Sequence, residues 1–313
     1  MENGNYSGKV VIIGAGNVGS TIAYSLLLNH LCNEIVIIDV SKDKASGEAL
    51  DMLHALYYSN SVKIRAGDYD ECADADIIIV TAGKARKPDQ TRTDLAKTNV
   101  SIAREIASNI KQYNKNPMMV VVSNPVDILT YVFRQELGIP ANRCIGSGTT
   151  LDTARLRYAC AAKLDIDVHD INLYVCGEHG DTMFPVWSSA NAACAPLGDL
   201  LINAGVSCDD LLAVTVSGGA EVIRKKGSTF YGISSATTKI VSAILKDENA
   251  VLPVAKVQEG EYLGISGVAL SLPYVVNKSG IARSIPISMN DAENESFKAS
   301  AEKLKTLLNE VYA

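Results

Sequence analysis

The segment that decides the fold of this chain is residues 10–19, which read VVIIGAGNVG. An apolar run comes first, a glycine-rich turn follows, and residues 21–28 (TIAYSLLL) have the character of a helix. Glycines let a backbone turn tightly and approach a pyrophosphate, whose charge is held by the free amides at the helix start. The order of strand, loop and helix therefore predicts a dinucleotide-binding turn, formed by Gly14, Gly16, Asn17, Val18 and Gly19.

A second apolar run, residues 35–38, ends in Asp39 at the distance expected of the acid that binds the adenosine ribose. A carboxylate at this position repels a 2′-phosphate, so the sequence favours NAD over NADP. The alternative is a glycine turn and a strand-end aspartate that bind no ligand. Because strand, loop, helix and acid occur together in this order, we favour the NAD site.

Four apolar runs in the first half predict buried strands, at residues 9–13, 35–39, 76–80 and 118–123. They alternate with helix-like segments, which is typical of an α/β fold with a Rossmann-type doubly wound parallel sheet. Ligands of such a sheet collect at the carboxyl ends of its strands. The residues expected to border the cofactor there are Thr81, Ala82, Gly83, Ser123 and Asn124, together with Asn99. For any one of the strand-end residues, ordinary strand-to-loop punctuation is an equal alternative.

The regular alternation of strand-like and helix-like segments ends near residues 145–148. We therefore expect an NAD-binding domain over residues 1–147 and an α+β catalytic domain over residues 148–313. The second domain should end in an amphipathic helix that packs on the core, since its apolar residues recur at helical spacing: Phe297, Ala301, Leu304, Leu308 and Val311.

Composition limits the class of protein. The 313 residues are 47% hydrophobic, enough for a sizeable core, and the net charge of −6 gives no global positive field for nucleic acid or an anionic membrane. No apolar run reaches the roughly 20 residues that span a bilayer, and no signal peptide is recognisable, so we expect a soluble cytoplasmic protein. The seven cysteines are scattered and predict reduced thiols, and no metal site is expected.

Acid–base chemistry is indicated by two further segments, LDTAR at residues 151–155 and GEHGDT at residues 177–182. His179 can carry a proton, Asp152 can orient and stabilise the protonated imidazole, and Arg155 can bind a carboxylate with two parallel hydrogen bonds. Taken alone, Asp152 and Arg155 are more typical of a helix salt bridge, because helices carry many such pairs. It is their combination with His179 and the dinucleotide turn that indicates a catalytic site.

The polar segment at residues 84–92, KARKPDQTR, follows the third predicted strand. It has the character of a lid that expels water and delivers Arg92 to a polarised carbonyl. The alternative is a solvated basic loop. Its place after a strand that should end beside the nicotinamide favours the lid.

Together with NPVD at residues 124–127, these motifs resemble the lactate/malate dehydrogenase family over nearly the whole chain. The resemblance implies hydride transfer between nicotinamide C4 and C2 of a 2-oxo or 2-hydroxy acid, in glycolysis or fermentation. It implies His179 as proton donor and acceptor, Asp152 as its partner and Arg155 on the substrate carboxylate. Arg92 is then expected at the reacting carbonyl, and Asn124 at the same oxygen or on the carboxamide side of the site. A non-catalytic NAD-binding sensor remains a distant alternative, because it would not need all of these side chains.

Two residues, Arg86 and Thr229, favour different substrates. Arg86 matches the lid arginine with which malate dehydrogenases bind the second carboxylate of oxaloacetate. Thr229 matches a residue that narrows the pocket of lactate dehydrogenases to the size of a methyl group. An arginine on a lid can turn to water, whereas a dicarboxylate in a narrowed pocket cannot escape its clash, so pyruvate and lactate are favoured over oxaloacetate and malate.

Regulation and assembly are implied only by the resemblance. Bacterial lactate dehydrogenases of this family bind fructose 1,6-bisphosphate between subunits through an arginine and a histidine. Arg157 matches the arginine, but the histidine position is Asn172, so activation by the sugar bisphosphate is doubtful. The family also implies a homotetramer, with a dimer as the alternative.

Overall fold

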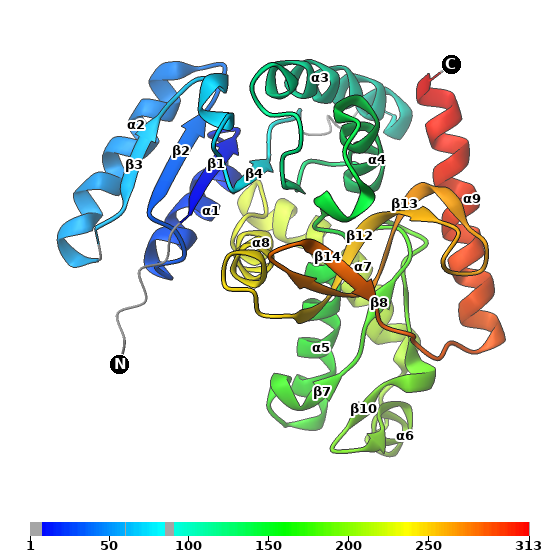
Figure 1. Cartoon of the computed structure of the whole chain (residues 1–313). Coiled ribbons are helices and arrows are strands. Elements are labelled where there is room, and N and C mark those ends of the chain that lie inside the picture. The colour runs from blue at the N-terminus through cyan, green and yellow to red at the C-terminus, as the bar shows by residue number, and fades with distance from the viewer. Residues whose placement is uncertain (1–7, 60, 85–90, 313) are drawn as a thin grey trace.

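The computed structural model describes residues 8–59, 61–84 and 91–312. The first half forms six parallel strands in the order β3-β2-β1-β4-β5-β6, the doubly wound arrangement expected from the sequence (Figure 1). The strands are β1 (Lys9–Ile13), β2 (Glu34–Ile38), β3 (Lys63–Ala66), β4 (Ile77–Val80), β5 (Met119–Val121) and β6 (Cys144–Gly146).

Helices connect these strands: α1 (Asn17–Leu28), α2 (Lys42–Ala55), α3 (Arg92–Tyr113) and α4 (Val126–Leu137), with the short turns η1 (Leu56–Tyr58), η2 (Tyr69–Cys72) and η3 (Ala141–Arg143). Right-handed crossovers place α1 and α2 on one face of the sheet and α3 and α4 on the other. The sheet is thus covered on both faces, which explains why β1, β4 and β5 are buried along their whole length.

All four predicted strands are present, and two more were missed. In β3 only Ile64 is buried, while Lys63 and Arg65 are exposed, so this edge strand has no continuous apolar run. The three-residue strand β6 is buried but too short to be recognised by pattern, and it lies where the sequence suggested a domain boundary. The division at residue 147 remains a prediction.

Three long strands of the second half extend the same sheet: β12 (Ala250–Glu259), β13 (Ser266–Asn277) and β14 (Gly280–Ser284). They are antiparallel, and β12 joins β6 where Ala255 faces Gly146. The resulting nine-stranded sheet runs through both halves of the chain. Two small sheets complete the second half, one of β7 (Ile171–Asn172), β10 (Asn191–Ala192) and β11 (Ala195–Pro196), the other of β8 (Val175–Cys176) and β9 (Phe184–Pro185).

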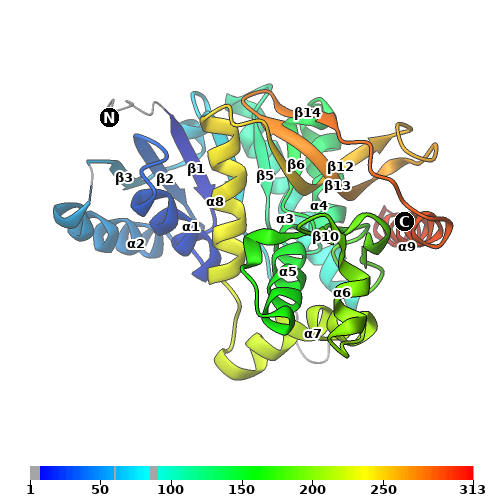
Figure 2. The same ribbon diagram turned by 90° about the horizontal axis from the view of Figure 1, so that it is seen from below.

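The helices of the second half are α5 (Thr150–Leu164), α6 (Leu197–Asn203), α7 (Cys208–Lys226), α8 (Tyr231–Leu245) and α9 (Asp291–Tyr312), with the turns η4 (Val168–Asp170) and η5 (Trp187–Ser189). Helix α8 packs along α1 (Figure 2). Helix α9 is the amphipathic helix expected from the sequence, and Phe297, Ala301, Leu304 and Leu308 are buried on it. Val311 packs against the same core from a partly exposed position.

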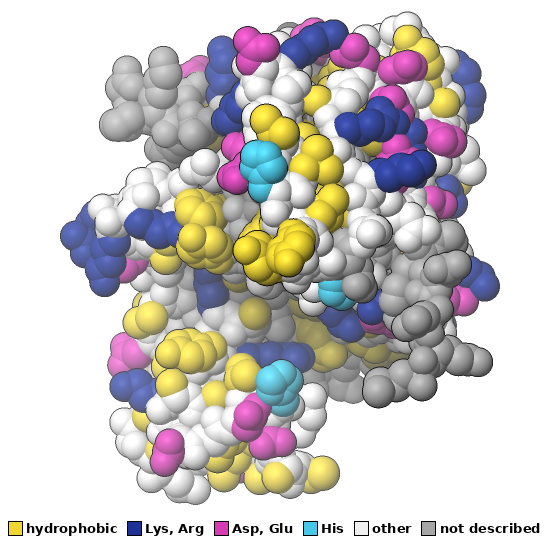
Figure 3. Space-filling view, turned by 90° about the vertical axis from the view of Figure 1, so that its left-hand side faces the viewer, with side chains coloured by type: hydrophobic (Ala, Val, Ile, Leu, Met, Phe, Trp, Pro, Cys, Tyr) yellow, Lys and Arg dark blue, Asp and Glu magenta, His cyan; other side chains and the backbone are white. Residues whose placement is uncertain are grey.

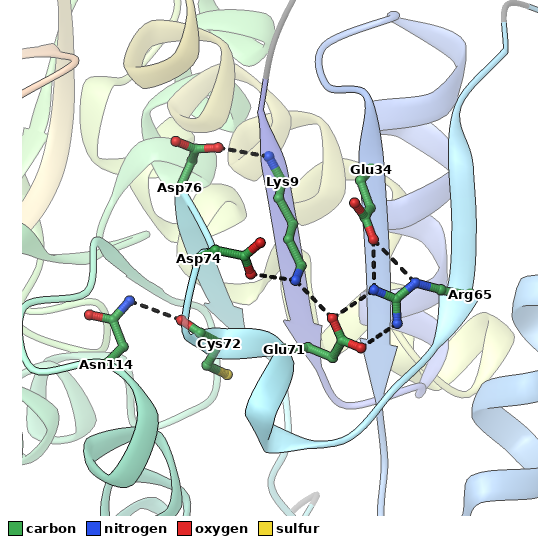
Figure 4. Close-up of polar contacts among 8 residues, drawn as sticks. All are labelled: Lys9, Glu34, Arg65, Glu71, Cys72, Asp74, Asp76 and Asn114. Atoms are coloured by element: carbon green, nitrogen blue, oxygen red, sulfur yellow. Dashed lines mark hydrogen bonds and ion pairs between the residues drawn. The ribbon is translucent and has the colours of Figure 1, made fainter.

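A polar network ties β1, β2 and β3 to the η2 turn (Figure 4). The Lys9 ammonium donates to Glu71 at 2.8 Å and to Asp74 at 2.6 Å. The Arg65 guanidinium donates to Glu34 at 2.7 Å and to both oxygens of Glu71. Glu71 therefore receives two cations, and the Arg65 hydrogen bond, with Lys9, lowers its pKa to about 2.

All seven cysteines are free thiols, five of them buried. Among the described residues, no group of histidine, cysteine and acidic side chains has the geometry to hold a metal ion. Within the same residues no single helix is long and apolar enough to cross a membrane; only α6 and α7 taken together reach that length and composition, and they are bent by 104°.

Candidate active site

The glycine turn has the backbone that the sequence predicts. Gly14 adopts φ 114°, and a Cβ there would lie 2.6 Å from the Thr81 hydroxyl. A Cβ on Gly19 would lie 1.8 Å from the Gly14 carbonyl oxygen, whereas one on Gly16 would meet no atom within 4 Å among the described residues. The first and third glycines thus pack the turn, and the second leaves open space for a phosphate group.

Asp39 directly follows β2 and lies beside this turn. Its Oδ2 accepts a hydrogen bond from the Ala15 amide at 2.7 Å, and its Oδ1 accepts one from the Ser41 amide at 2.9 Å. The carboxylate is therefore fixed next to the start of α1, where a ribose attached to a bound pyrophosphate would lie.

Three polar side chains join the carboxyl ends of neighbouring strands. The Thr81 hydroxyl donates to the Gly14 carbonyl at 3.0 Å, and the Ser123 hydroxyl donates to the Ala82 carbonyl at 2.6 Å. Buried Asn99 donates to the Asn124 carbonyl at 2.7 Å and accepts from the Lys84 amide at 2.8 Å. These residues hold the cofactor edge together, a structural role that the sequence did not indicate.

His179, Asp152 and Arg155 meet as predicted. The His179 Nδ1 lies 2.6 Å from Asp152 Oδ2, and Arg155 donates to Asp152 Oδ1 at 3.1 Å. Asp152 is only 2% exposed, so its charge acts on His179 with little screening by water. With Nδ1 bound to the carboxylate, Nε2 is left for a substrate.

Arg155 lies beside two glycines of α7. A Cβ on Gly219 would lie 3.6 Å from a guanidinium nitrogen of Arg155, and one on Gly218 would lie 3.8 Å from its Cδ. The backbone of α7 thus lies close to the guanidinium, and α5 carries Asp152 three residues before Arg155.

The loop that carries His179 is held by the C-terminal helix. Buried Glu178 accepts from Lys303 of α9 at 2.9 Å and from the Thr182 hydroxyl, and Ser300 of α9 donates to the Thr182 carbonyl at 2.8 Å. At Gly177, φ is 88° and a Cβ would lie 2.6 Å from the Ser300 hydroxyl. The glycine thus allows a close approach between the loop and α9.

A second carboxylate reaches His179 from α4. Asp127 Oδ2 accepts the His179 backbone amide at 2.8 Å, and Asp127 is 3% exposed. In the sequence, Asp127 stands out only as part of the NPVD motif at residues 124–127. Its signal was a single acid within the otherwise apolar segment that follows Pro125.

The electrostatics favour a charged pair. Burial lowers the pKa of His179, but Asp152, through its charge and hydrogen bond, outweighs this effect and raises the pKa to about 9. Burial acts to raise the pKa of Asp152, yet His179 and Arg155 hold it below its ordinary value. At neutral pH the site therefore holds an imidazolium next to a carboxylate.

These side chains line one cavity of about 490 Å³ that also reaches the cofactor edge. Thr229, Asn124, Ser123 and Gly83 contribute to it from other elements. The cavity thus joins the predicted dinucleotide turn, through Val18, to the acid–base pair. An arrangement of this kind can protonate an oxygen while an arginine holds an anion beside it.

Two predicted site residues cannot be placed. Arg86 lies outside the described residues. Arg92 is the first residue of α3, but its side chain also lies outside them.

Arg157, the residue that matches the arginine of the sugar-bisphosphate site, donates to the Leu173 carbonyl at 2.8 Å and lies over the Tyr174 ring at 4.9 Å. Its guanidinium is therefore used within the subunit.

Family models match the chain in two parts. Residues 8–146 match the lactate/malate dehydrogenase NAD binding domain, and residues 149–313 match the lactate/malate dehydrogenase alpha/beta C-terminal domain. The chain belongs to the lactate/malate dehydrogenase family. The expected fold and the expected cofactor, NAD, are thereby confirmed, and the open space at Gly16 with Asp39 nearby fits that cofactor.

Members of this family with a named activity cover almost the entire chain. An L-lactate dehydrogenase of Streptococcus equi subsp. equi is 43% identical over 97% of this chain and 94% of its own, and one of Streptococcus pyogenes serotype M3 is 42% identical over the same shares. The crystal structure of a minor L-lactate dehydrogenase from Enterococcus mundtii has a TM-score of 0.93 at 41% identity, covering 97% of this chain and 98% of that one. A lactate dehydrogenase from a deep-sea metagenome of the Medee basin has a TM-score of 0.94 at 37% identity, covering 98% and 99%.

Proposed function

We propose that this protein is an NAD-dependent L-lactate dehydrogenase that interconverts pyruvate and L-lactate. The observation that carries the proposal is the cavity in which His179, bound to Asp152, faces the same space as Arg155 and Thr229. The similarity to L-lactate dehydrogenases over the whole chain supports the same activity.

The geometry of the cavity supports a proposed role for each side chain. Arg155 binds the substrate carboxylate, because its guanidinium faces the cavity and can form two parallel hydrogen bonds. His179 donates its Nε2 proton to the carbonyl oxygen, and Asp152 stabilises the imidazolium before the transfer. The glycine turn and Asp39 would hold NADH, which would supply a hydride for C2 of the ketone. In the reverse direction neutral His179 accepts the hydroxyl proton.

Arg92 and Asn124 are proposed to stabilise the charge that develops on the carbonyl oxygen. A cation and a proton donor bind that oxygen more strongly in the transition state than in the ground state. Asn124 lines the cavity, and its backbone is fixed there by Asn99. The cofactor-edge residues Thr81, Ala82, Gly83 and Ser123 are proposed to border the nicotinamide.

Pyruvate is the proposed substrate in preference to oxaloacetate. Thr229 lines the cavity and limits the room beside the reacting carbon. The relatives with a named activity are L-lactate dehydrogenases, which favours the same substrate. Arg86 is the residue that would favour a dicarboxylate. With pyruvate as substrate, the reaction returns NAD⁺ to glycolysis, as in a fermentation.

The test is NADH oxidation by the purified protein with pyruvate and oxaloacetate in parallel, with and without fructose 1,6-bisphosphate. We expect kcat/KM for pyruvate to exceed that for oxaloacetate by tenfold or more, about 1.4 kcal/mol. A Thr229→Gly variant should reduce this ratio, since it enlarges the pocket. A preference for oxaloacetate in the unaltered protein would make the enzyme a malate dehydrogenase instead.

We further propose assembly into a homotetramer, with a dimer as the alternative, in the cytoplasm. Large apolar side chains are exposed on α2 and η1, namely Leu50, Leu53, Tyr57 and Tyr58. Figure 3 shows hydrophobic side chains gathered on the side of the molecule that carries α2. Free thiols fit a reducing compartment. Light scattering should give a mass well above the 33.3 kDa of one chain, and a monomer would contradict the assembly.

A further inference from the structure

Asp127 is a buried acid that the mechanism above does not use. It lies in the first turn of α4, 3% exposed, and its Oδ2 accepts the backbone amide of His179 at 2.8 Å. Its Oδ1 is buried and has no hydrogen-bond partner among the described residues. A buried oxygen of this kind costs free energy, so its presence calls for a compensating role.

The charges around Asp127 and His179 come from three elements. Helix α5 supplies Asp152 and Arg155, the loop itself supplies Glu178 and Asp181, and α9 supplies Lys303. Lys303 lies 2.9 Å from Glu178, and Arg155 lies 3.1 Å from Asp152. Within the part of the chain that the structure describes, Asp127 forms no salt bridge with Lys or Arg, and His179 is the cation that lowers the energy of its charged form.

We propose that Asp127 is a positioning residue for the reaction, which holds His179 by its backbone amide and adds a second negative charge beside the imidazolium. Asp152 holds the ring, and Asp127 holds the main chain of the same residue from a different helix. The two carboxylates thus fix both ends of His179 between α4 and α5. The proposal rests on the proposed function, since it concerns the same proton transfer.

The protonation of Asp127 and the protonation of His179 affect each other. Burial raises the pKa of Asp127 to about 7, although the positive charge of His179 acts to lower it. When His179 gives up its proton, Asp127 loses the neighbouring cation and its own proton affinity increases. Ionised Asp127 therefore favours the protonated enzyme that reduces the ketone.

The experiment separates the hydrogen bond from the charge. Asp127→Asn keeps an oxygen that can accept the His179 amide but removes the charge, whereas Asp127→Ala removes both. Glu136→Gln is the matched control, because Glu136 is on the same helix, is 38% exposed and pairs with Arg104. All four proteins are assayed for pyruvate reduction as a function of pH, with NADH affinity and melting temperature measured alongside.

For Asp127→Asn we expect the alkaline limb of kcat/KM to move to lower pH by about one unit, the effect of removing one nearby opposite charge. The kcat at pH 6 and the NADH affinity should stay within about threefold of the unaltered protein, because the amide contact is retained. Asp127→Ala should show the same shift together with a tenfold or greater loss of kcat. Glu136→Gln should leave the limb in place.

An unmoved limb in Asp127→Asn, or an equal shift in Glu136→Gln, would overturn the proposal. If the Asp127 variants do not fold, NMR of histidine-labelled unaltered protein gives the answer without substrate. The His179 signal, assigned by its loss in His179→Asn, should titrate in two steps, and a single step would count against the proposal. Failure of the proposed function would be distinct, since the unaltered protein would then not reduce pyruvate at any pH.

Discussion

The protonation of His179 is set by carboxylates that come from two helices. Asp152 of α5 lies 2.6 Å from the ring nitrogen, and Asp127 of α4 accepts the backbone amide. Both favour the imidazolium, which raises the pKa of His179 to about 9 despite its burial. The His179 ring is therefore protonated at neutral pH, which is the form that the proposed ketone reduction requires.

The pH dependence of the two directions should be opposite. Reduction of pyruvate needs the protonated ring, so its kcat/KM should be level near neutrality and fall as the pH rises through about 9. Oxidation of lactate needs the neutral ring, so its kcat/KM should rise up to the same pH. Initial rates in both directions on one preparation test this, and parallel profiles would exclude His179 as the proton carrier.

At the scale of single residues, the sequence indicated side chains suited to the proposed chemistry but did not indicate Asp127, which holds the main chain of His179. His179, Asp152 and Arg155 could be proposed from the sequence because each carries a group suited to the proposed reaction, and the structure brings them to one cavity with Thr229. Asp127 could not be proposed, because its contact is with a main-chain amide 52 positions away. Such a contact depends on how α4 and the loop pack, which no local pattern encodes.

The catalytic loop depends on a contact between elements far apart in the chain. Residues 177–183 lie against α9, where Lys303 compensates the buried charge of Glu178 and Ser300 binds Thr182. Helix α9 also reaches the start of α3, since Thr93 donates to Glu310 at 3.0 Å. Helix α9 therefore supports both the loop that carries His179 and the first turn of α3.

Lys303→Met should weaken this support. The buried Glu178 carboxylate would lose its cation, which costs about 1–3 kcal/mol of stability, and we expect kcat/KM to fall about tenfold through a displaced loop. Lys305→Met is the control, because Lys305 pairs only across the surface with Glu302 at 2.9 Å. Thermal unfolding and pyruvate kinetics of both variants are the measurements. Equal effects of the two substitutions would refute a special role for Lys303.

The elements that the sequence predicted are those with a recognisable apolar pattern. The apolar strands β1, β2, β4 and β5 and the amphipathic helix α9 follow from hydrophobic pattern alone. The edge strand β3 did not, because its alternating charged residues serve the network with Glu34 and Glu71 instead of a core. The joining of β12 to β6 was also beyond prediction, since it rests on a single bridge between residues far apart in sequence.

Across the whole molecule, the polar network on the first three strands contributes to stability far from the active site. Glu71 is its centre and is 20% exposed, while Lys9 is 11% exposed. The folded-state pKa of Glu71, about 2, lies below its value in the unfolded chain. The stabilisation is therefore complete above about pH 5 and is lost as the pH falls toward 2.

Glu71→Gln should lower the free energy of unfolding at pH 7 by about 1–2 kcal/mol. The difference from the unaltered protein should shrink as the pH falls below about 4.3, the ordinary glutamate value. Denaturant unfolding at a series of pH values measures it. Glu302→Gln, a change in a surface pair whose carboxylate is 72% exposed, serves as control and should cost less than about 0.5 kcal/mol. A pH-independent difference for Glu71→Gln would contradict this explanation.

The most direct test of the account is the paired measurement of pyruvate turnover and NADH binding in His179→Asn, beside His169→Asn, whose histidine is exposed on η4. We predict that His179→Asn binds NADH as the unaltered protein does, while kcat/KM for pyruvate falls about 10³-fold, the contribution of a general acid. His169→Asn should retain both properties. Turnover within tenfold of the unaltered protein, or an equal loss of NADH binding, would contradict the assignment of His179 as the proton donor of a lactate dehydrogenase.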